Sequence, residues 1–389
     1  MPEPGGSGGL ESEAGAQVAG GHAKPSGSPT VNRRTGSLRR VSPGPLRIAT
    51  RGSALALAQA RIVADGLLAA WPGIEVELVR VVTEGDRRRD LATTQLGGKG
   101  VFTAAVQQAV LDGDADLAVH SAKDLPAAQA PGLALAAVPE REDPCDVLVT
   151  AAGGSGGLKS EARTQATGGH AEPSGSPPVN HGAGERRPDP LDGLPTGSRV
   201  GTGSPRRVAL LFWLRPDLEV LPLRGNVDTR VGKVLAGELD AAVLAASGLR
   251  RLGLPAAGAG RLDPEVFTPA PGQGCLAVEA RAGDRRVLDL LAALTHEPSR
   301  TALAGERAFL ARLGGSCTLP AGALLTVAGD GSLEARGFLA ALDGKGLVRE
   351  RLTGSAAGAA ALGRDLADRL LAVCGPEVRA LIEASARRS

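Results

Sequence analysis

Three segments place arginine, in two cases with serine, where an apolar strand pattern gives way to a helix pattern. A helix N-terminus exposes free backbone N–H groups and a partial positive charge, so anions bind there. Arginine in a first helical turn opposes that charge unless an anion fills the site, and its guanidinium pairs readily with carboxylate or phosphate. Capping and solvated surface charge explain any single junction, but three together favour an anion-binding cleft. The three are ATRGS with Arg51 and Ser53, GTGSPRR with Ser204, Arg206 and Arg207, and LRGNVDTR with Arg224 and Arg230.

A lysine and a carboxylate stand side by side in AVHSAKDLP, as Lys123 and Asp124, after an apolar strand pattern. In α/β sheets ligands lie beyond the carboxyl ends of the strands. Among basic groups Asp124 would stay ionised, so it could meet a cationic or N–H-bearing group of a substrate whose acids the arginines hold. The alternative is a simple turn ahead of Pro126. The glycine loop GGKG, which carries Lys99, lacks the spacing of a phosphate-binding P-loop.

Cys317 follows two glycines in GERAFLARLGGSCTLPAG, where a helix pattern ends. Glycines let another backbone or a bulky ligand approach, so this thiol could be a nucleophile or a covalent attachment point. A buried, inert cysteine is the alternative. Cys145, Cys275 and Cys374 are expected in core or loop positions. The sequence holds no CxxC pair, and no metal site is predicted.

Alternating strand and helix patterns must position these residues. We expect strands at 46–50, 74–83, 115–121, 198–202, 218–224 and 240–246, and helices at 54–70, 100–113, 205–214 and near 227–236. Such alternation favours α/β domains with mostly parallel sheets. From about residue 297 a helix at 299–313, short strands and a last helix near 356–373 indicate a smaller α+β domain.

Two segments differ from the rest of the chain in composition. Residues 1–44 and 151–190 are rich in Gly, Pro and Ser, which predicts a disordered tail and a disordered insert. Residues 5–32 recur as 153–180 with 21 of 28 positions identical, which indicates one duplicated low-complexity element. The net charge of +2 and the aromatic content of 2% disfavour binding to nucleic acid or a membrane surface. The first residues lack the apolar stretch of a secretory signal, so we expect a cytoplasmic protein.

The chain resembles the porphobilinogen deaminase (hydroxymethylbilane synthase) family over residues 46–150 and 191–373. The shared motifs, in chain order, are RIATRGSALAL, VTEGD, GGKGVF, AVHSAKDLP, EREDPCD, VGTGSPRR, LRGNVDTR, GLRRLG, PGQG and ERAFLARLGGSCTLP. The resemblance implies two lobes like those of periplasmic binding proteins and a C-terminal α+β domain. The expected limits are 45–140 with 270–292 for the first lobe, 141–269 for the second and 297–389 for the C-terminal domain.

The resemblance also implies a chemistry, in which the enzyme builds its own cofactor. Cys317 would hold a dipyrromethane through a thioether. Four porphobilinogens would be added head to tail with loss of ammonia, and water would release hydroxymethylbilane. Asp124 matches the family's catalytic aspartate, which stabilises the azafulvenium cation formed on deamination, and Phe102 matches an aromatic residue near the cofactor. The remaining residues expected to bind cofactor or substrate are Arg51, Ser53, Lys99, Lys123, Thr202, Ser204, Arg206, Arg207, Arg224 and Arg230.

A few positions depart from the family pattern. Gly203 stands where a second serine is usual, Gln95 where a lysine is common, and Leu319 and Ala321 differ in type near the cysteine. The resemblance implies a monomeric transferase that uses porphobilinogen as its substrate in tetrapyrrole and haem biosynthesis.

Two rival interpretations stay open. One is a non-catalytic, two-lobed anion-binding protein, and the other is an acyl transferase with a histidine within reach of Cys317.

Overall fold

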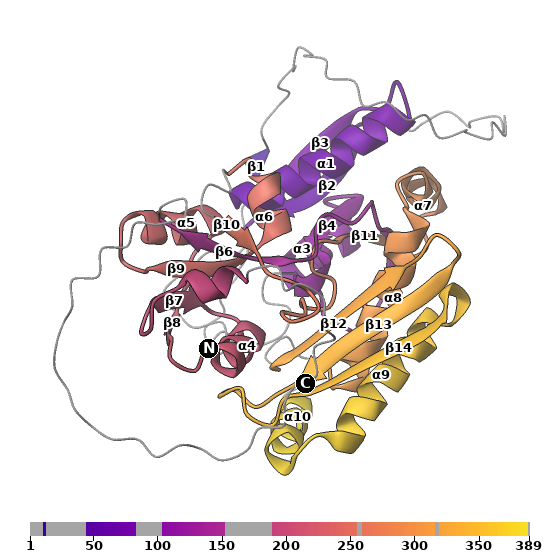
Figure 1. The fold of residues 1–389 in the computed structure, drawn as a ribbon. Helices are drawn as coiled ribbons and strands as arrows, with labels where there is room; N and C mark the ends of the chain where they lie inside the picture. The colour runs from indigo at the N-terminus through magenta and orange to yellow at the C-terminus, as the bar shows by residue number, and fades with distance from the viewer. Residues whose placement is uncertain are drawn as a thin grey trace, which may run out of the picture.

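The computed structural model describes residues 11–12, 44–82, 103–151, 189–254, 259–315 and 319–387. These residues form three sheets with helices packed on them, arranged as two lobes and a C-terminal domain that lies below both (Figure 1). The expected fold class, two α/β lobes with a smaller α+β domain, is confirmed. In the described part of the chain, no helix is both long enough and apolar enough to cross a bilayer.

The first sheet and its helices are called lobe 1. Its strands, in spatial order, are β1 (Glu11–Ser12), β3 (Val76–Val81), β2 (Leu46–Arg51), β4 (Leu117–Ser121), β11 (Leu276–Arg281) and β5 (Leu133–Ala137). Helix α1 (Ala54–Ala70) packs on one face against Ile48 and Leu117, with α7 (Arg285–Ala292) beside it. Helix α3 (Ala104–Leu111) packs on the other face against Ala49 and Ala118. Successive residues of a strand face opposite sides of the sheet. Because helices cover both sides here, the middle residues of β2 and β4 are mostly apolar.

The second sheet and its helices are called lobe 2. Its strands, in spatial order, are β10 (Ala259–Arg261), β6 (Asp146–Thr150), β9 (Ala241–Ala245), β7 (Arg199–Thr202) and β8 (Glu219–Pro222). Helix α4 (Pro205–Leu214) packs on one face through Leu210 and Leu211. Helices α5 (Val227–Leu235) and α6 (Ala246–Arg251) pack on the other through Val234 and Leu249. The helix expected at 205–214 has those bounds, as has the helix expected at 54–70.

Most strands of each lobe's sheet run in one direction, as expected, but each of these sheets also contains antiparallel strands. Strand β2 runs parallel to β3 and β4, and β7 runs parallel to β8 and β9. By contrast, β11 is antiparallel to β4 and β5, and β6 is antiparallel to β9 and β10. Strands β6 and β11 each begin where the chain arrives from the other lobe. Such a strand enters at the edge where the parallel strands end, so it runs opposite to them.

Most of the two segments expected to be disordered lies outside the described residues. Glu11–Ser12 differ from that expectation, since they pair with Arg80 and Val79 of β3. Strand β3 is otherwise an edge of the sheet, and its outer backbone groups can accept a partner strand. At the end of the insert, Pro190–Gly193 form a 3-10 turn whose first amides are capped by Asp189.

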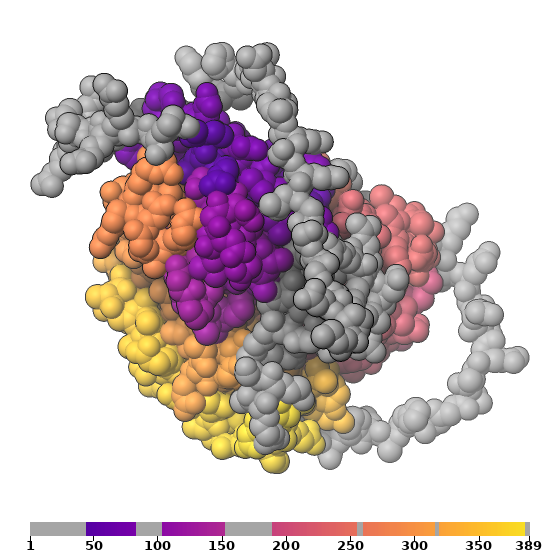
Figure 2. Space-filling model, turned by 180° about the vertical axis from the view of Figure 1, so that it is seen from behind, coloured from indigo at the N-terminus to yellow at the C-terminus, as the bar shows by residue number. Residues whose placement is uncertain are grey.

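The C-terminal domain packs α8 (Glu297–Arg312) and α9 (Ala359–Val373) on a three-stranded antiparallel sheet. The strands are β12 (Ala321–Val327), β13 (Ser332–Leu339) and β14 (Val348–Ser355). The two helices approach closely at a glycine pair, since a Cβ on Gly363 would lie 2.0 Å from the Gly305 oxygen. From behind, this domain is seen against lobe 1 (Figure 2). Helix α10 (Pro376–Arg387) was not expected, because Pro376 ends one helical pattern and opens another.

A buried carboxylate joins the C-terminal domain to both crossovers between the lobes. Glu306 of α8 is fully buried and forms a bidentate pair with Arg141, at 2.7 and 3.1 Å, on the crossover into lobe 2. It also accepts a hydrogen bond from the Gly272 amide, at 2.6 Å, on the crossover back to lobe 1. The Leu325 amide of β12 donates to it as well, at 2.9 Å. One side chain therefore fixes both hinge segments on one domain.

The Glu306→Gln variant tests this junction. Removing one partner of a buried ion pair leaves Arg141 uncompensated, so we expect the free energy of unfolding to fall by about 3–5 kcal/mol. Urea unfolding followed by circular dichroism measures it. The matched control is Glu297→Gln on the same helix, whose pair with Arg300 is exposed on both sides and is worth at most about 1 kcal/mol. Equal losses in the two variants would contradict a special role for Glu306.

Candidate active site

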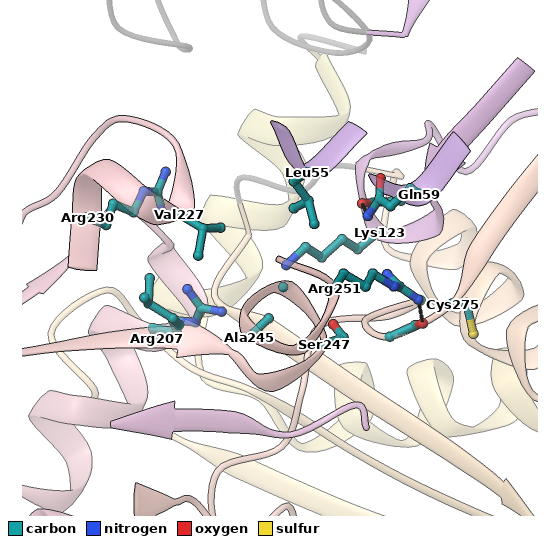
Figure 3. A pocket seen from close by; sticks show the side chains of 15 residues that line it. Leu55, Gln59, Lys123, Arg207, Val227, Arg230, Ala245, Ser247, Arg251 and Cys275 are labelled. Atoms are coloured by element: carbon teal, nitrogen blue, oxygen red, sulfur yellow. Dashed lines mark hydrogen bonds between the residues drawn. The ribbon is translucent and has the colours of Figure 1, made fainter. Parts of the chain in front are cut away.

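A cavity of about 70 Å³ lies between the lobes, at the carboxyl ends of their parallel strands. Lobe 1 contributes Leu55, Gln59 and Lys123, and lobe 2 contributes Arg207 and Arg230 (Figure 3). The returning crossover closes it with Gly272, Gly274 and Cys275, and α6 adds Ser247 and Arg251. This is the place where the sequence pattern predicted ligand binding.

Four cationic side chains converge on this cavity. Lys123 reaches across from lobe 1 toward Arg207, with Arg230 on the opposite wall and Arg251 beneath (Figure 3). Burial and the charge of Arg207 together lower the pKa of Lys123 to about 8, against the attraction of Asp124 and Asp146. Burial also lowers the pKa of Arg230 and of Arg251. Like charges gathered out of water in this way favour an anionic ligand.

A protein carboxylate already neutralises part of this charge. Asp146, the fully buried first residue of β6, accepts from Arg206 Nη2 at 2.7 Å and from Arg207 Nε and Nη2 at 3.0 and 2.7 Å. Gln273 Nε2 donates to the same carboxylate at 3.0 Å. Burial raises the pKa of Asp146, but the two guanidiniums outweigh that effect and hold it below its usual value. The sequence pattern predicted an anion at the start of this helix, and the Asp146 carboxylate supplies part of that negative charge.

The local sequence explains where these arginines lie. Ser204 is the N-cap of α4 and Pro205 its first residue, as expected, but the Ser204 side chain makes no capping hydrogen bond. Its amide instead donates to Thr202 Oγ1 at 3.2 Å, at the end of β7. The Ser204 hydroxyl is therefore not used within the helix. By contrast, Ser53 caps α1 by accepting from the Ala56 amide at 3.3 Å.

Lys123 and Asp124 lie in a short 3-10 turn (Ala122–Asp124) directly after β4. The returning crossover passes over this turn, since a Cβ on Gly272 would lie 3.0 Å from the Lys123 amide nitrogen. Lys123 Nζ donates to Gln273 Oε1 at 3.4 Å, while the Asp124 carboxylate is exposed. The charge of Asp124 is felt by both Lys123 and Arg230, so the carboxylate sits at the cationic cleft.

The structure brings together some of the expected site residues and not others. Lys123, Arg207 and Arg230 line one cavity, whereas Arg206 turns into the interior of lobe 2 and donates to Thr268 O at 2.8 Å. Arg51, Ser53, Thr202, Ser204 and Arg224 stand at strand ends or helix starts but do not line the cavity. Lys99, Phe102 and Cys317 lie outside the described residues.

Three residues of the site were not identified from the sequence. Asp146 and Gln273 lie in the motifs EREDPCD and PGQG, and Arg251 lies in GLRRLG. Arg251 Nη2 donates to the Gly274 carbonyl at 2.6 Å, which holds its guanidinium at the cavity (Figure 3). One signal in the sequence could have identified Asp146, because it is a charged residue at the start of an apolar strand pattern. A charge buried there requires a partner of opposite charge.

The lowered pKa of Lys123 predicts how stability depends on pH. Between about pH 8 and pH 10.5 the unfolded chain binds more protons at this lysine than the folded chain, so the free energy of unfolding should rise with pH. In a Cys317→Ala background the added Lys123→Met substitution should remove that rise, and urea titrations across this range measure it. Lys345→Met, at a lysine 81% exposed, is the control. If the free energy of unfolding changed with pH in the same way with and without Lys123, the pKa of this lysine would not be lowered by burial.

Solved structures that resemble the chain are only distantly similar. The probable amino-acid transporter extracellular-binding protein YtmK of Bacillus subtilis has a TM-score of 0.34 and 8% identity, covering 64% of this chain and 90% of that one. A putative periplasmic sulfonate-binding protein of Methylobacillus flagellatus has a TM-score of 0.30 and 14% identity, covering 68% and 67%.

Sequence relatives are far closer. A family model described as the dipyrromethane cofactor-binding domain of porphobilinogen deaminase matches residues 46–289, and one for its C-terminal domain matches 301–372. The porphobilinogen deaminase of Roseiflexus castenholzii is 45% identical over 326 residues, covering 84% of this chain and 95% of that protein. That of Trichlorobacter lovleyi is 41% identical over 338 residues, covering 87% and 96%. The chain therefore belongs to the porphobilinogen deaminase family.

Proposed function

We propose that the cleft between the lobes carries out the family's reaction, with Asp124 at the reacting centre and basic side chains of both lobes holding the acids of the substrate. Porphobilinogen deaminase, a transferase also called hydroxymethylbilane synthase, joins four porphobilinogens with loss of ammonia and releases hydroxymethylbilane by hydrolysis. The observation that carries our assignment is the convergence of Lys123, Arg207, Arg230 and Arg251 on one cavity beside Asp124.

The chemistry of these donors fits a dipyrromethane. Its two pyrroles bear four carboxylates, and the cleft gathers cations whose hydrogen bonds, as far as the described residues show them, go to backbone carbonyls, to Asp146 or to Gln273 Oε1. Lys123, Ser204, Arg206 and Arg207 would hold these acids, and Cys317 would form the thioether. When bound, the group supplies the pyrrole carbon that accepts the first substrate.

Asp124 acts on the deaminating substrate through its charge. When ammonia leaves, the substrate becomes a cation conjugated with its pyrrole N–H, and a fixed carboxylate beside it lowers the energy of that state. The charge of Asp124 acts on both Lys123 and Arg230, so cations that can bind the substrate's acids lie near the carboxylate that stabilises its cation. The carboxylate is exposed in the turn after β4, where it can reach an incoming substrate.

The substrate's acetate and propionate groups bind, in this proposal, at the three strand-to-helix junctions. The arginines there can pair with an acid through two hydrogen bonds, and the helix start adds free backbone N–H groups. Lys99 and Phe102 complete the site from the segment ahead of α3. The residues assigned to substrate binding are Arg51, Ser53, Lys99, Phe102, Thr202, Arg224 and Arg230.

The size of the cavity requires the lobes or their side chains to move. At about 70 Å³ it has room for a few water molecules, whereas small-molecule sites usually span roughly 300–1,000 Å³. A chain that grows by four pyrroles must enlarge the cleft at every addition. The crossovers held by Glu306 are the segments about which the lobes would turn.

We also propose the domain limits, the oligomeric state, the location and the partners that go with this function. We infer domain limits of 45–140 with 270–292 for lobe 1, 141–269 for lobe 2 and 297–389 for the C-terminal domain. The protein would act as a monomer in the cytoplasm, with porphobilinogen as its partner and without nucleic acid or membrane.

The Asp124→Asn variant tests the assignment. Asparagine keeps the size of the side chain but loses its charge, so we expect kcat for porphobilinogen consumption to fall by about 10²–10³-fold. KM and the unfolding midpoint should change little, because the arginines still hold the acids and the position is exposed. Asp289→Asn, at an exposed aspartate of α7, is the control and should keep wild-type kcat.

Ammonia release separates the enzyme from a binding protein. The wild type should release one ammonia for each porphobilinogen consumed. Binding of porphobilinogen without ammonia release would favour a non-catalytic anion-binding protein, and a near wild-type kcat in Asp124→Asn would move the catalytic role away from this residue.

A further inference from the structure

Helix α4 connects the cationic cleft to the C-terminal domain. Its first turn carries Arg206 and Arg207, and its last turn carries Trp213. Ten residues at about 1.5 Å each make a rod about 15 Å long. Helix α4 packs on the sheet of lobe 2, and the C-terminal sheet lies near its last turn (Figure 1). A shift of the last turn therefore carries the arginine backbone with it.

The far end of α4 is held by a cation on an indole. The guanidinium carbon of Arg349, on β14, lies 4.2 Å from the centre of the Trp213 ring. The same guanidinium donates to the carbonyls of Glu265, at 3.2 Å, and Val266. The Nε of Arg349 is buried, and burial lowers the pKa of this guanidinium to about 10. Arg349 thus joins the C-terminal sheet to both α4 and the neighbouring turn of lobe 2.

The turn between β13 and β14 packs closely against the same part of α4. A Cβ on Gly344 would lie 2.6 Å from the Trp213 nitrogen and 2.8 Å from the Ala209 oxygen. With a φ of +78° this position suits glycine alone. Phe338 of β13 and Leu210 of α4 belong to one apolar core. The hairpin therefore touches both the backbone and the side chains of the helix.

We propose that Arg349, Trp213 and Gly344 form a latch that holds α4 against the C-terminal sheet and so positions Arg206 and Arg207 at the cleft. Arg349 and Gly344 belong to the C-terminal domain, whose sequence between α8 and β12 includes Cys317, whereas Trp213 belongs to lobe 2. The inference rests on the proposed function. The three latch residues touch no reacting atom and act as positioning residues through α4.

The proposal separates binding from chemistry. Asp124 lies on lobe 1 and is not part of the latch, so loosening the latch should leave kcat within about twofold. Misplaced Arg206 and Arg207 would hold the cofactor's acids in a shifted position, and the porphobilinogen that binds beside the cofactor would then bind less well. KM for porphobilinogen should therefore rise roughly three- to tenfold. A contact that serves stability alone would lower the unfolding midpoint and leave KM unchanged in the folded protein.

The test compares three variants of the full chain. Arg349→Met removes the cation and its donors, and Arg349→Lys keeps the charge but not the planar stack, so its effect should be smaller. Arg351→Met is the matched control, because Arg351 lies on the same strand, pairs with Glu334 at 2.8 Å and is 56% exposed. We expect KM to rise in the order Arg351→Met, Arg349→Lys, Arg349→Met, with kcat nearly constant.

A second readout does not depend on turnover. Trp71 and Trp213 are the two tryptophans, so in a Trp71→Phe background the emission reports on the latch alone. The emission of the cofactor-loaded protein should differ from that of its Cys317→Ala form, because filling the arginine end shifts the other end of α4. Arg349→Met should abolish that difference.

Distinct outcomes overturn distinct claims. A loaded, active wild type with equal KM in all three variants and no loading-dependent Trp213 emission would overturn the latch and leave the proposed function intact. A wild type that neither loads the cofactor nor consumes porphobilinogen would overturn the proposed function and the latch with it.

Discussion

The buried carboxylate of Asp146 is the constraint on which the rest of the site depends. A cleft for a growing polyanion needs many cations close together, and like charges out of water repel one another and lose solvation. Asp146 accepts from Arg206, Arg207 and Gln273 at 2.7–3.0 Å and so holds two guanidiniums in fixed positions before any ligand arrives. Arg207, Lys123, Arg230 and Arg251 line the same cavity, where they would meet the ligand's acids. Preorganised charge of this kind is what binding and stabilising charged states require.

The topology explains why one carboxylate can do this. Asp146 opens β6, the strand with which the chain arrives from lobe 1, and it therefore stands at the edge of lobe 2 that faces the cleft. Gln273 lies on the returning crossover, and Glu306 fixes both crossovers to α8. The counterion, the hinge segments and the C-terminal domain thus form one continuous set of contacts. Any change in the separation of the lobes must therefore alter these contacts.

Local patterns predicted much of the fold, because helix starts and stops are local chemistry. Helices α1 and α4 have the expected bounds, where Ser53 and Pro205 open them and proline-containing segments follow them. The antiparallel strands and the pairing of Asp146 with Arg206 and Arg207 were missed, since these partners stand 60 and 61 residues apart in sequence. No periodicity shows which distant residues the crossovers bring together. Arg251 was missed for the same reason, because its place beside the Gly274 carbonyl depends on the returning crossover.

The central claim is that the cationic cleft serves a polyanion tethered to Cys317. The most direct test is the intact mass of the natively expressed wild type beside the Cys317→Ala variant. The account predicts an added mass equal to a dipyrromethane in the wild type and none in the variant. A wild type without the added mass, unchanged after incubation with porphobilinogen, would contradict it.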